Sequence, residues 1–447
     1  MADPEPSMST AEIHIAIIGG GLCGLALAIA LERRRISYTI YELQSTFSEI
    51  GAGLNVAPNA IAAFNAIEPK LGDAVMALGT RNSPNAEVWM VNRLGAPTDR
   101  FPDAHAITEI IAPGVGHTAV GRYELLNLLA SKIDTRHARF QKKLTRVEQG
   151  EDAATLHFED GTVDAAHIVI GCDGIHSAVR RSLVGNDHRA AEPRFTGIGG
   201  YRAVFPMDQL AEAIGPEVAR TSCIWSGPGG YATMYSIEGG KKVNVGLWLS
   251  KEQYRERVKN DRWVLRKQKA EMLEDCRSWG PSIQKVMRMM GEETTLWTSH
   301  HHDMELDSYF KGRVCVIGDA AHSMGPHQGQ GASQAMEDAY VMSVVLSQIK
   351  DPSCDHMSPL LCIEAAFSGW QEVRKPQAEW VLRTSHEAFD WWSSFWRRDL
   401  EEKDIEERSR EATFRFRRIW DANVDRQGDV AKYSMLRSLQ KAMQVAL

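Results

Sequence analysis

The sequence lacks several features that mark common classes of protein. No stretch approaches the roughly 20 consecutive apolar residues that span a bilayer, so we expect no membrane span. Positive charge is not in excess, because 51 Lys and Arg stand against 58 Asp and Glu, and the net charge of −7 repels nucleic acid. The seven cysteines are an odd number without a CxxC pair, which argues against a disulfide framework and a zinc site and favours a reducing, cytoplasmic location.

Other absences narrow the class further. Residues 1–10 are polar and acidic, and no basic flank precedes the apolar run that begins at Ile13, so we expect no signal peptide. Neither an internal repeat nor a low-complexity linker is present. The 447 residues, of which 43% are hydrophobic and 24% charged, therefore predict a fully folded protein of two or three domains.

A nucleotide-binding unit is predicted at the front of the chain. Residues 13–18 are apolar and β-branched, which is typical of a strand buried on both faces, and residues 22–31 carry the spacing of a helix. The turn between them reads GGGLCG and matches GxGxxG. The glycines that permit a tight turn and the close approach of a pyrophosphate are Gly19, Gly21 and Gly24.

Glu42 ends the next extended run, residues 38–41, and is placed to accept hydrogen bonds from ribose hydroxyls. This unit alone predicts a bound dinucleotide and is equally consistent with NAD and FAD. No second GxGxxG follows an apolar strand.

Later segments predict further strands and a second domain. Residues 154–163 resemble a hairpin around Asp160-Gly161, and apolar strands are expected at 167–170 and 314–317. From about 195 to 300, glycine-rich turns alternate with strand-like runs, which predicts an antiparallel sheet on the substrate side. We therefore expect an α/β fold with a discontinuous Rossmann-type FAD-binding domain (residues 11–190 and 305–360), a substrate domain (191–304) and a C-terminal helical region (361–447).

Two further motifs identify the dinucleotide. Residues 171–180, GCDGIHSAVR, and 318–331, GDAAHSMGPHQGQG, resemble the DG and GD motifs of the class A FAD-dependent aromatic hydroxylases. Further similar segments lie at residues 51–53, 58–60, 111–116 and 201–203, and the resemblance is closest to the salicylate hydroxylase branch. It is weak beyond about residue 360. In the stretch 329–335, Gln330, Ser333 and Ala335 depart from the bacterial salicylate enzymes.

This resemblance implies a bound FAD, with NADH or NADPH as a transient co-substrate that binds in a groove near Asp173. It implies that a flavin C4a-hydroperoxide transfers one oxygen atom from O2 to a small phenol. Salicylate, converted to catechol with loss of CO2, is the first candidate; hydroxylation or dearomatisation of a resorcinol- or orcinaldehyde-type polyketide intermediate is the alternative. The resemblance also places Gly53, Arg122 and Asp173 along FAD and Asp319 at its ribityl chain.

The glycines of the GD segment have their own physical explanation. Gly329 and Gly331 let backbone N–H groups approach a ligand just before a helix that begins near Ala332. The positive end of that helix would stabilise the negative charge of a reduced flavin.

Three residues are candidates for the chemistry on the phenol. His327 follows Pro326 in the GD segment and is the candidate base, since histidine titrates near neutral pH, whereas His322 is expected to pack or hydrogen-bond near the cofactor. Arg202 either steadies an anionic substrate or the flavin-bound peroxide oxygens, or forms a plain salt bridge. Tyr235, on the neighbouring predicted strand, is the candidate hydrogen-bonding partner of the substrate oxygen.

Residues that form apolar walls or the protein core cannot be told apart from the sequence. Trp225, Met234 and Trp248 fit either role. The run His300-His301-His302-Asp303 is not expected to bind a metal, because successive residues of an extended segment point to opposite faces.

The C-terminal region combines dense charge with tryptophan. Its helices are expected to pack on the domain surfaces, with a dimer face as the alternative explanation of Trp391, Trp392, Trp396 and Trp420. A monomer or a homodimer is expected.

Overall fold

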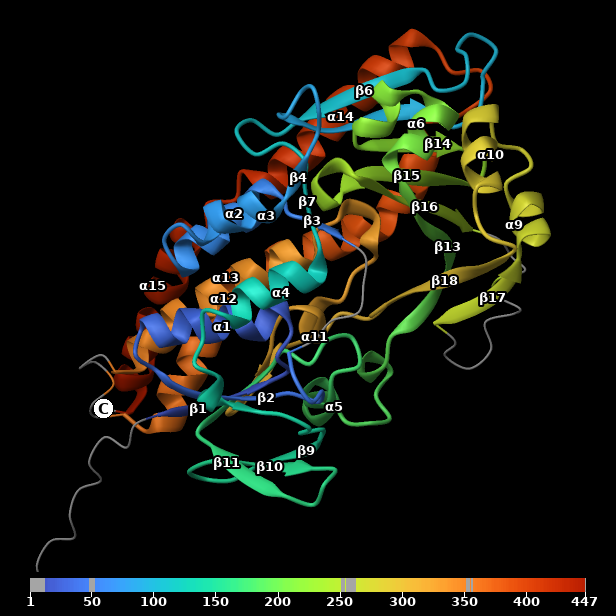
Figure 1. Ribbon diagram of the computed structural model, residues 1–447. Helices are drawn as coiled ribbons and strands as arrows, with labels where there is room; N and C mark the ends of the chain where they lie inside the picture. The colour runs from blue at the N-terminus through green and yellow to red at the C-terminus, as the bar shows by residue number, and fades with distance from the viewer. Residues whose placement is uncertain are drawn as a thin grey trace, which may run out of the picture.

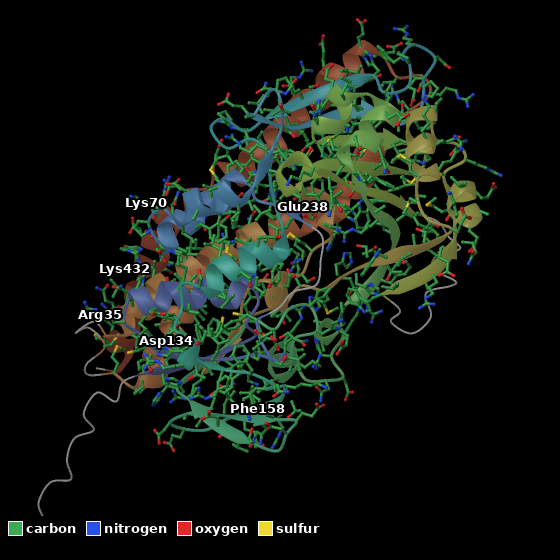
Figure 2. All side chains as sticks on the ribbon, in the orientation of Figure 1. Arg35, Lys70, Asp134, Phe158, Glu238 and Lys432 are labelled. Atoms are coloured by element: carbon green, nitrogen blue, oxygen red, sulfur yellow. The ribbon has the colours of Figure 1, made fainter. Side chains whose placement is uncertain are left out.

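The computed structural model describes residues 13–47, 53–250, 254, 263–350, 354 and 357–446. It has two large sheets at opposite ends of an elongated molecule, and long helices run between them (Figure 1). Side chains fill the space between the sheets and the helices (Figure 2). The fold is mixed α/β, as the sequence predicts. Of the similar segment 51–53, only Gly53 lies within the described residues.

The first sheet is built around the predicted βαβ unit. Over the described residues it has six strands in the order β19-β20-β12-β1-β2-β8, and all neighbouring pairs except β19–β20 are parallel. Because parallel strands end at the same edge, the GxGxxG, DG and GD motifs follow the adjacent strands β1, β12 and β20 at one edge of this sheet. The strands are β1 His14–Ile18, β2 Ser37–Tyr41, β8 Ala138–Arg139, β12 Ile168–Gly171, β19 Phe310–Lys311 and β20 Val314–Val316.

Helices and one small sheet pack around the first sheet, while the other small sheet and the helix Glu402–Trp420 contact the second large sheet. α1 packs against α12. α13 packs against α12 and α15 and extends to the second large sheet (Figure 1). The helices are α1 Leu22–Arg33, α2 Pro58–Ile67, α3 Leu71–Leu78, α4 Arg122–Ala130, α5 Ala178–Val184, α11 Asp319–His322, α12 Gly331–Ser347, α13 Pro359–Ser393, α14 Glu402–Trp420 and α15 Val424–Ala446. The small sheets contain β9 Leu144–Gln149, β10 Ala154–Phe158 and β11 Val163–Ala166, and β3 Leu54–Asn55, β4 Thr80–Arg81 and β7 Thr118–Val120.

The second sheet has eight strands in the described residues, in the order β17-β18-β13-β16-β15-β14-β5-β6. Its neighbouring pairs are antiparallel, as predicted, except for the parallel pair β14–β5. The strands are β5 Val88–Leu94, β6 Ala106–Ile111, β13 Arg194–Pro206, β14 Cys223–Gly227, β15 Gly230–Ile237, β16 Lys242–Ser250, β17 Val264–Gln268 and β18 Glu293–His301. The stretch 11–190 thus adds β5 and β6 to this sheet, because the open edge of β14 takes β5 as its backbone partner. The domain boundaries stay predictions.

The two faces of the second sheet have different neighbours. One face packs on α6 Met207–Ile214, α7 Pro216–Arg220, α9 Lys269–Asp275 and α10 Pro281–Arg288 and forms a buried apolar cluster with them. The other face looks toward α13 and the GD segment. Trp225 and Met234 belong to the first cluster and are core residues.

The C-terminal tryptophans form another buried cluster with the second sheet. Trp391, Trp392 and Trp420 are at most 7% exposed and pack with Trp89 and Phe416, so these rings form no exposed aromatic face. The expectation that the C-terminal helices pack on the domains is confirmed. Among the described helices, none is long and apolar enough to cross a membrane.

Candidate active site

The turn of the GxGxxG motif leaves room only for glycine at two positions. Gly19 has a φ of +102°, and a Cβ there would lie 2.5 Å from the carbonyl oxygen of Cys172. A Cβ on Gly24 would lie 2.0 Å from the carbonyl oxygen of Gly19. At Gly21, the N-cap of α1, nothing lies within 4 Å of such a Cβ, no side chain caps the helix, and its first turn has no acidic residue. The positive end of α1 is therefore uncapped and has open space beside Gly21, which is compatible with the predicted binding of a pyrophosphate.

Two predicted cofactor residues use their carboxylates within the protein. Glu42 accepts a hydrogen bond of 2.6 Å from the backbone N–H of Gly20, which ties the end of β2 to the motif. Asp173 accepts from Ser177 Oγ at 2.5 Å and from the N–H of Ala178 at 2.7 Å, so it caps α5. Burial raises the pKa of Asp173, and these hydrogen bonds offset part of the increase. The roles of Glu42 and Asp173 toward FAD stay predictions.

A buried ion network holds the GD segment. Asp338, on α12, accepts from the N–H of Gly318 at 2.9 Å, lies 2.6 Å from His322 Nε2 and accepts from Arg374 Nε at 2.8 Å. Although burial alone would raise it, the His322 and Arg374 side chains lower the pKa of Asp338 to about 2. The hydrogen-bonding role expected of His322 is confirmed.

A cavity of about 290 Å³ lies between the GD segment and the second sheet. We call it the first cavity, and it brings together most of the residues that the GD motif and the substrate sheet predicted. Its floor is one face of the sheet, where Gly246 of β16 is paired with Arg202 on one side and Thr233 on the other. Because Gly246 has no side chain, the floor is open at this point; a Cβ would lie 3.0 Å from Thr233 Oγ1. The predicted residues that line it are Gly53, Arg122, Arg202, Tyr235, Asp319, His327, Gly329 and Gly331.

Arg202 presents a positive charge to the first cavity. It lies on β13, and among the described residues no carboxylate forms a salt bridge with it. The plain salt bridge that the sequence left open is therefore absent from this part of the chain. Because Arg202 is exposed, its charge needs no partner within the protein and is available to an anionic group on a ligand.

Tyr235 is held at the rim of the same cavity. Its hydroxyl donates to the carbonyl oxygen of Gly53 at 2.9 Å. Burial raises the pKa of Tyr235, while Arg202 and a hydrogen bond with Asn244 lower it in part. The hydroxyl would have to turn from Gly53 to donate to a substrate.

His327 and Tyr231 form a buried pair in the first cavity. The Tyr231 hydroxyl lies 2.6 Å from His327 Nδ1, and the backbone carbonyl of His327 accepts from Trp392 Nε1 at 2.9 Å. Burial lowers the pKa of His327 to about 3, with smaller contributions from His386 and His301, and it raises the pKa of Tyr231. At neutral pH His327 is therefore uncharged. It can accept a proton, but its protonated form is unfavourable at this buried position.

The residues around the GD loop fit a flat polar ring system. Gln330 is 1% exposed and lines the first cavity, yet neither atom of its side-chain amide has a hydrogen-bond partner among the described residues. Ser333 Oγ and Asn55 Oδ1 are likewise buried without a partner in the described chain. Gly329, at φ +65°, has open space around a Cβ, and no side chain caps α12. The unpaired polar atoms could hydrogen-bond to the flavin ring of FAD, and the uncapped N-terminus of α12 would stabilise the negative charge of the reduced ring.

Sequence reasoning missed several residues of the site. Tyr231 lies two and four residues before Thr233 and Tyr235, which also line the cavity from β15, so the alternation of a strand could have found it. His117 lines the cavity with its ring tilted against Tyr235, the two ring centroids 5.4 Å apart, and Asn244 of β16 pairs with Tyr235 of β15, but no motif marks either residue. Trp248, which could be assigned to core or wall, lines the cavity.

The described residues show no metal centre. No group of three or more His, Cys, Asp and Glu side chains in this part of the chain is arranged to hold a metal ion. His300 stacks on Trp263 at 4.0 Å, whereas His301 stacks on His386 at 3.7 Å, so neighbouring histidines of the run face different surroundings.

Comparisons with known proteins agree with this site. Residues 12–350 match the family described as the FAD binding domain. The chain is 31% identical over 444 residues to the FAD-dependent monooxygenase eupB of a Phoma species, covering 94% of this chain and 97% of that one. It is 34% identical over 394 residues to the 6-methylsalicylate 1-monooxygenase atA of Aspergillus terreus, covering 84% and 82%.

A solved structure extends the similarity to three dimensions. A salicylate hydroxylase in a substrate complex superposes with a TM-score of 0.81 at 26% identity and covers 95% of this chain and 98% of that one. The motifs, the two-sheet fold, the cavity and these relatives agree. The chain belongs to the FAD-dependent monooxygenases of the salicylate hydroxylase type.

Proposed function

We propose that this monooxygenase hydroxylates a small phenol that carries an anionic group beside its hydroxyl, with salicylate as the first candidate. The observation that carries the proposal is that a cation and an uncharged proton acceptor line the same cavity. Arg202 offers a cation without a carboxylate partner in the described chain, and the buried Tyr231–His327 pair offers an uncharged proton acceptor. A 2-hydroxybenzoate has a carboxylate for the first and a hydroxyl for the second.

The overall reaction balances in atoms and charge. Salicylate, O2, NADH or NADPH and two protons yield catechol, CO2, water and the oxidised nicotinamide. When bound, FAD takes the hydride and activates O2 for transfer of one oxygen atom to the carboxylated carbon.

The protein residues have distinct tasks in this scheme. Arg202 holds the carboxylate by a charge-assisted hydrogen bond, and Tyr231 takes the phenolic proton as it donates its own to His327 Nδ1. Trp248 and the other cavity walls keep water from the reacting atoms. Tyr235 orients the substrate oxygen from the rim.

The cofactor-binding residues follow from the motifs and the open geometry. We assign the pyrophosphate to the turn of Gly19, Gly21 and Gly24, and the adenosine ribose to Glu42. Asp319 and Arg122, at the N-terminal ends of α11 and α4 beside the first cavity, are assigned to the ribityl chain and the ring. Gly53, Gly329 and Gly331 have no side chain, so the flavin ring would be able to approach the backbone at these positions. The loop that contains Asp173, and not its carboxylate, is assigned to FAD binding, because the carboxylate caps α5.

A second substrate class is favoured by the cluster of Arg202, Tyr235 and Asn244. These three polar residues lie together at one end of the sheet face and would hold the two oxygens of a resorcinol- or orcinaldehyde-type ring. Hydroxylation of such a ring, with or without loss of aromaticity, needs no carboxylate and releases no CO2.

A substrate panel separates the two. The FAD-loaded enzyme is given salicylate or 2,4-dihydroxy-6-methylbenzaldehyde, and NADH and NADPH loss, oxygen uptake, CO2 and catechol are followed together. Salicylate should give equal amounts of NAD(P)H oxidised, CO2 and catechol. Oxidation of NAD(P)H by salicylate without catechol, together with a hydroxylated product from the aldehyde, would refute the first candidate in favour of the second.

Variants test the residues. Arg202→Gln should raise KM for salicylate about 10- to 100-fold, the loss of one charged hydrogen bond, with unchanged FAD content. The matched control is Arg266→Gln, an exposed arginine on β17 of the same sheet, which should leave KM unchanged. If His327→Ala keeps normal turnover with tightly coupled oxygen use, the assignment of His327 is wrong.

A further inference from the structure

A second cavity, of about 170 Å³, lies behind the first. The two cavities share Gly325 and His327, so this part of the GD segment borders both of them. Three histidines face the second cavity: His327 from the GD segment, His301 from the end of β18 and His386 from α13. They come from segments far apart in the sequence.

Each of these histidines has a ring nitrogen that the described residues leave without a hydrogen-bond partner. They are His327 Nε2, His301 Nδ1 and His386 Nε2, and all three atoms are buried. Buried polar atoms in folded proteins are almost always paired with protein or water. A polar cavity of this volume holds several water molecules, which would provide those partners.

The second cavity is lined by one exposed carboxylate, and another lies close to two of its histidines. Asp390, one turn along α13 from His386, lines it and is exposed. Asp303 follows β18, acts electrostatically on both His301 and His386, and has a side chain that is 23% exposed. It forms salt bridges at 2.7 Å with Arg189 and at 3.7 Å with Arg194.

We infer that the second cavity is a proton-relay chamber, in which His301 and His386 accept the proton from Nε2 of His327 and pass it to solvent. The inference rests on the proposed role of Tyr231 and His327. The substrate hydroxyl gives a proton to Tyr231 as Tyr231 gives its own to Nδ1 of His327, and Nε2 releases a proton into the chamber. One proton leaves the substrate, one reaches solvent, and no electrons move.

Burial explains why a relay is needed. The His327 site strongly disfavours an imidazolium, because burial lowers the pKa of this histidine to about 3. Loss of a proton from Nε2 as one arrives at Nδ1 keeps the ring uncharged throughout. The reverse shift, after the reaction, returns a proton to the product and restores the first tautomer.

The relay is tested without turnover. FAD-loaded enzyme, with no NADH or NADPH, is mixed in a stopped-flow instrument with 2,4-dihydroxybenzaldehyde, whose phenolate absorbs at longer wavelength than its phenol. The double variant His301→Gln/His386→Gln should form bound phenolate about tenfold more slowly or worse, with the final amount unchanged, since a relay sets the rate and not the equilibrium. Imidazole added to the buffer should restore the rate.

The control is His300→Gln, a buried histidine on the same strand that lines neither cavity, and its rate should match that of the unchanged enzyme. A double variant with the unchanged rate overturns the relay. His327→Gln separates the two proposals: it should lower both the rate and the amount of phenolate. If it lowers neither, the base assignment fails; if it lowers both while the double variant is silent, only the relay fails.

A second measurement needs no variant. The rate of phenolate formation by the unchanged enzyme is measured in mixtures of H2O and D2O. Several protons moving in a chain give a curved dependence on the deuterium fraction, whereas a linear dependence, the mark of one proton in flight, overturns the relay.

Discussion

Arg374 should be among the most sensitive positions for stability, because it neutralises two buried carboxylates at once. Its guanidinium lies 2.6 Å from Glu337 Oε2 and 2.8 Å from Asp338 Oδ1, and all three side chains are fully buried. It also donates to Gln334 Oε1 at 2.9 Å and to Gln427 Oε1 at 2.7 Å. Arg374→Met keeps much of the volume and removes every one of these bonds.

The magnitude follows from what is left behind. Removal of one partner from a buried ion pair costs about 3–5 kcal/mol, because the other charge stays buried without compensation. Asp338 keeps the N–H of Gly318 and the His322 ring, whereas Glu337 keeps only uncharged amide donors, so Glu337 bears most of the cost; these donors are Asn59, Gln334 and Gln427. The double variant Arg374→Met/Glu337→Gln should therefore recover about 1–3 kcal/mol.

Urea titration followed by circular dichroism measures the loss, and fluorescence of released FAD measures its affinity. FAD should bind more weakly, since Asp338 positions the first residue of the GD segment. The control is Arg417→Met, whose partner Asp421 lies 2.9 Å away in a pair that is 51% and 59% exposed, and it should cost at most about 1 kcal/mol. If the two variants lose the same stability, the argument from burial is wrong.

Three further predictions concern glycines, pH and the tyrosine. Gly21→Ala should leave the apoprotein as stable as before but weaken FAD binding, since its Cβ meets only open space, whereas Gly24→Ala should destabilise the apoprotein itself, as thermal unfolding with and without FAD will show. Burial lowers the pKa of His117 and His327 from 6.5 to about 3, so the unfolded chain binds more protons than the folded chain between these pH values. The free energy of unfolding should therefore fall as pH drops from about 6.5 toward 3, by up to about 5 kcal/mol per histidine. A free energy of unfolding that does not change over this pH range contradicts the prediction. Tyr231→Phe leaves His327 Nδ1 buried without its partner and should cost about 1–3 kcal/mol in urea unfolding and slow hydroxylation, and an unchanged kcat would count against the pair.

Local pattern was enough for the elements and motifs that neighbouring residues specify. The GxGxxG turn, α1, β2 ending at Tyr41 just before Glu42, and the strand before Asp319 lie close to where the sequence predicted them. The contribution of β5 and β6 to the second sheet was not visible, because strand pairing across about 130 residues leaves no local signal.

Some residues of the candidate site could likewise be predicted from the sequence, and others could not. His327, Arg202 and the GD glycines could be selected by type and position, and they do line one cavity. The alternation of β15 could also have found Tyr231, but His301 and His386 could not be selected, since each matters only for what it faces. Asp173 shows the opposite case, where a motif residue is used to cap α5.

The sequence by itself determined a dinucleotide-binding unit, because glycine spacing and strand-turn-helix order act over a few residues, and the resemblance of its DG and GD motifs to a known family indicated FAD and the class of chemistry. Only the tertiary structure decided which groups meet. It placed the uncharged His327 at the border of two cavities, left Arg202 without a carboxylate partner in the described chain, and tied the GD segment to Arg374 through Asp338. Burial and pairing set the charge of each group, and both depend on segments brought together by folding.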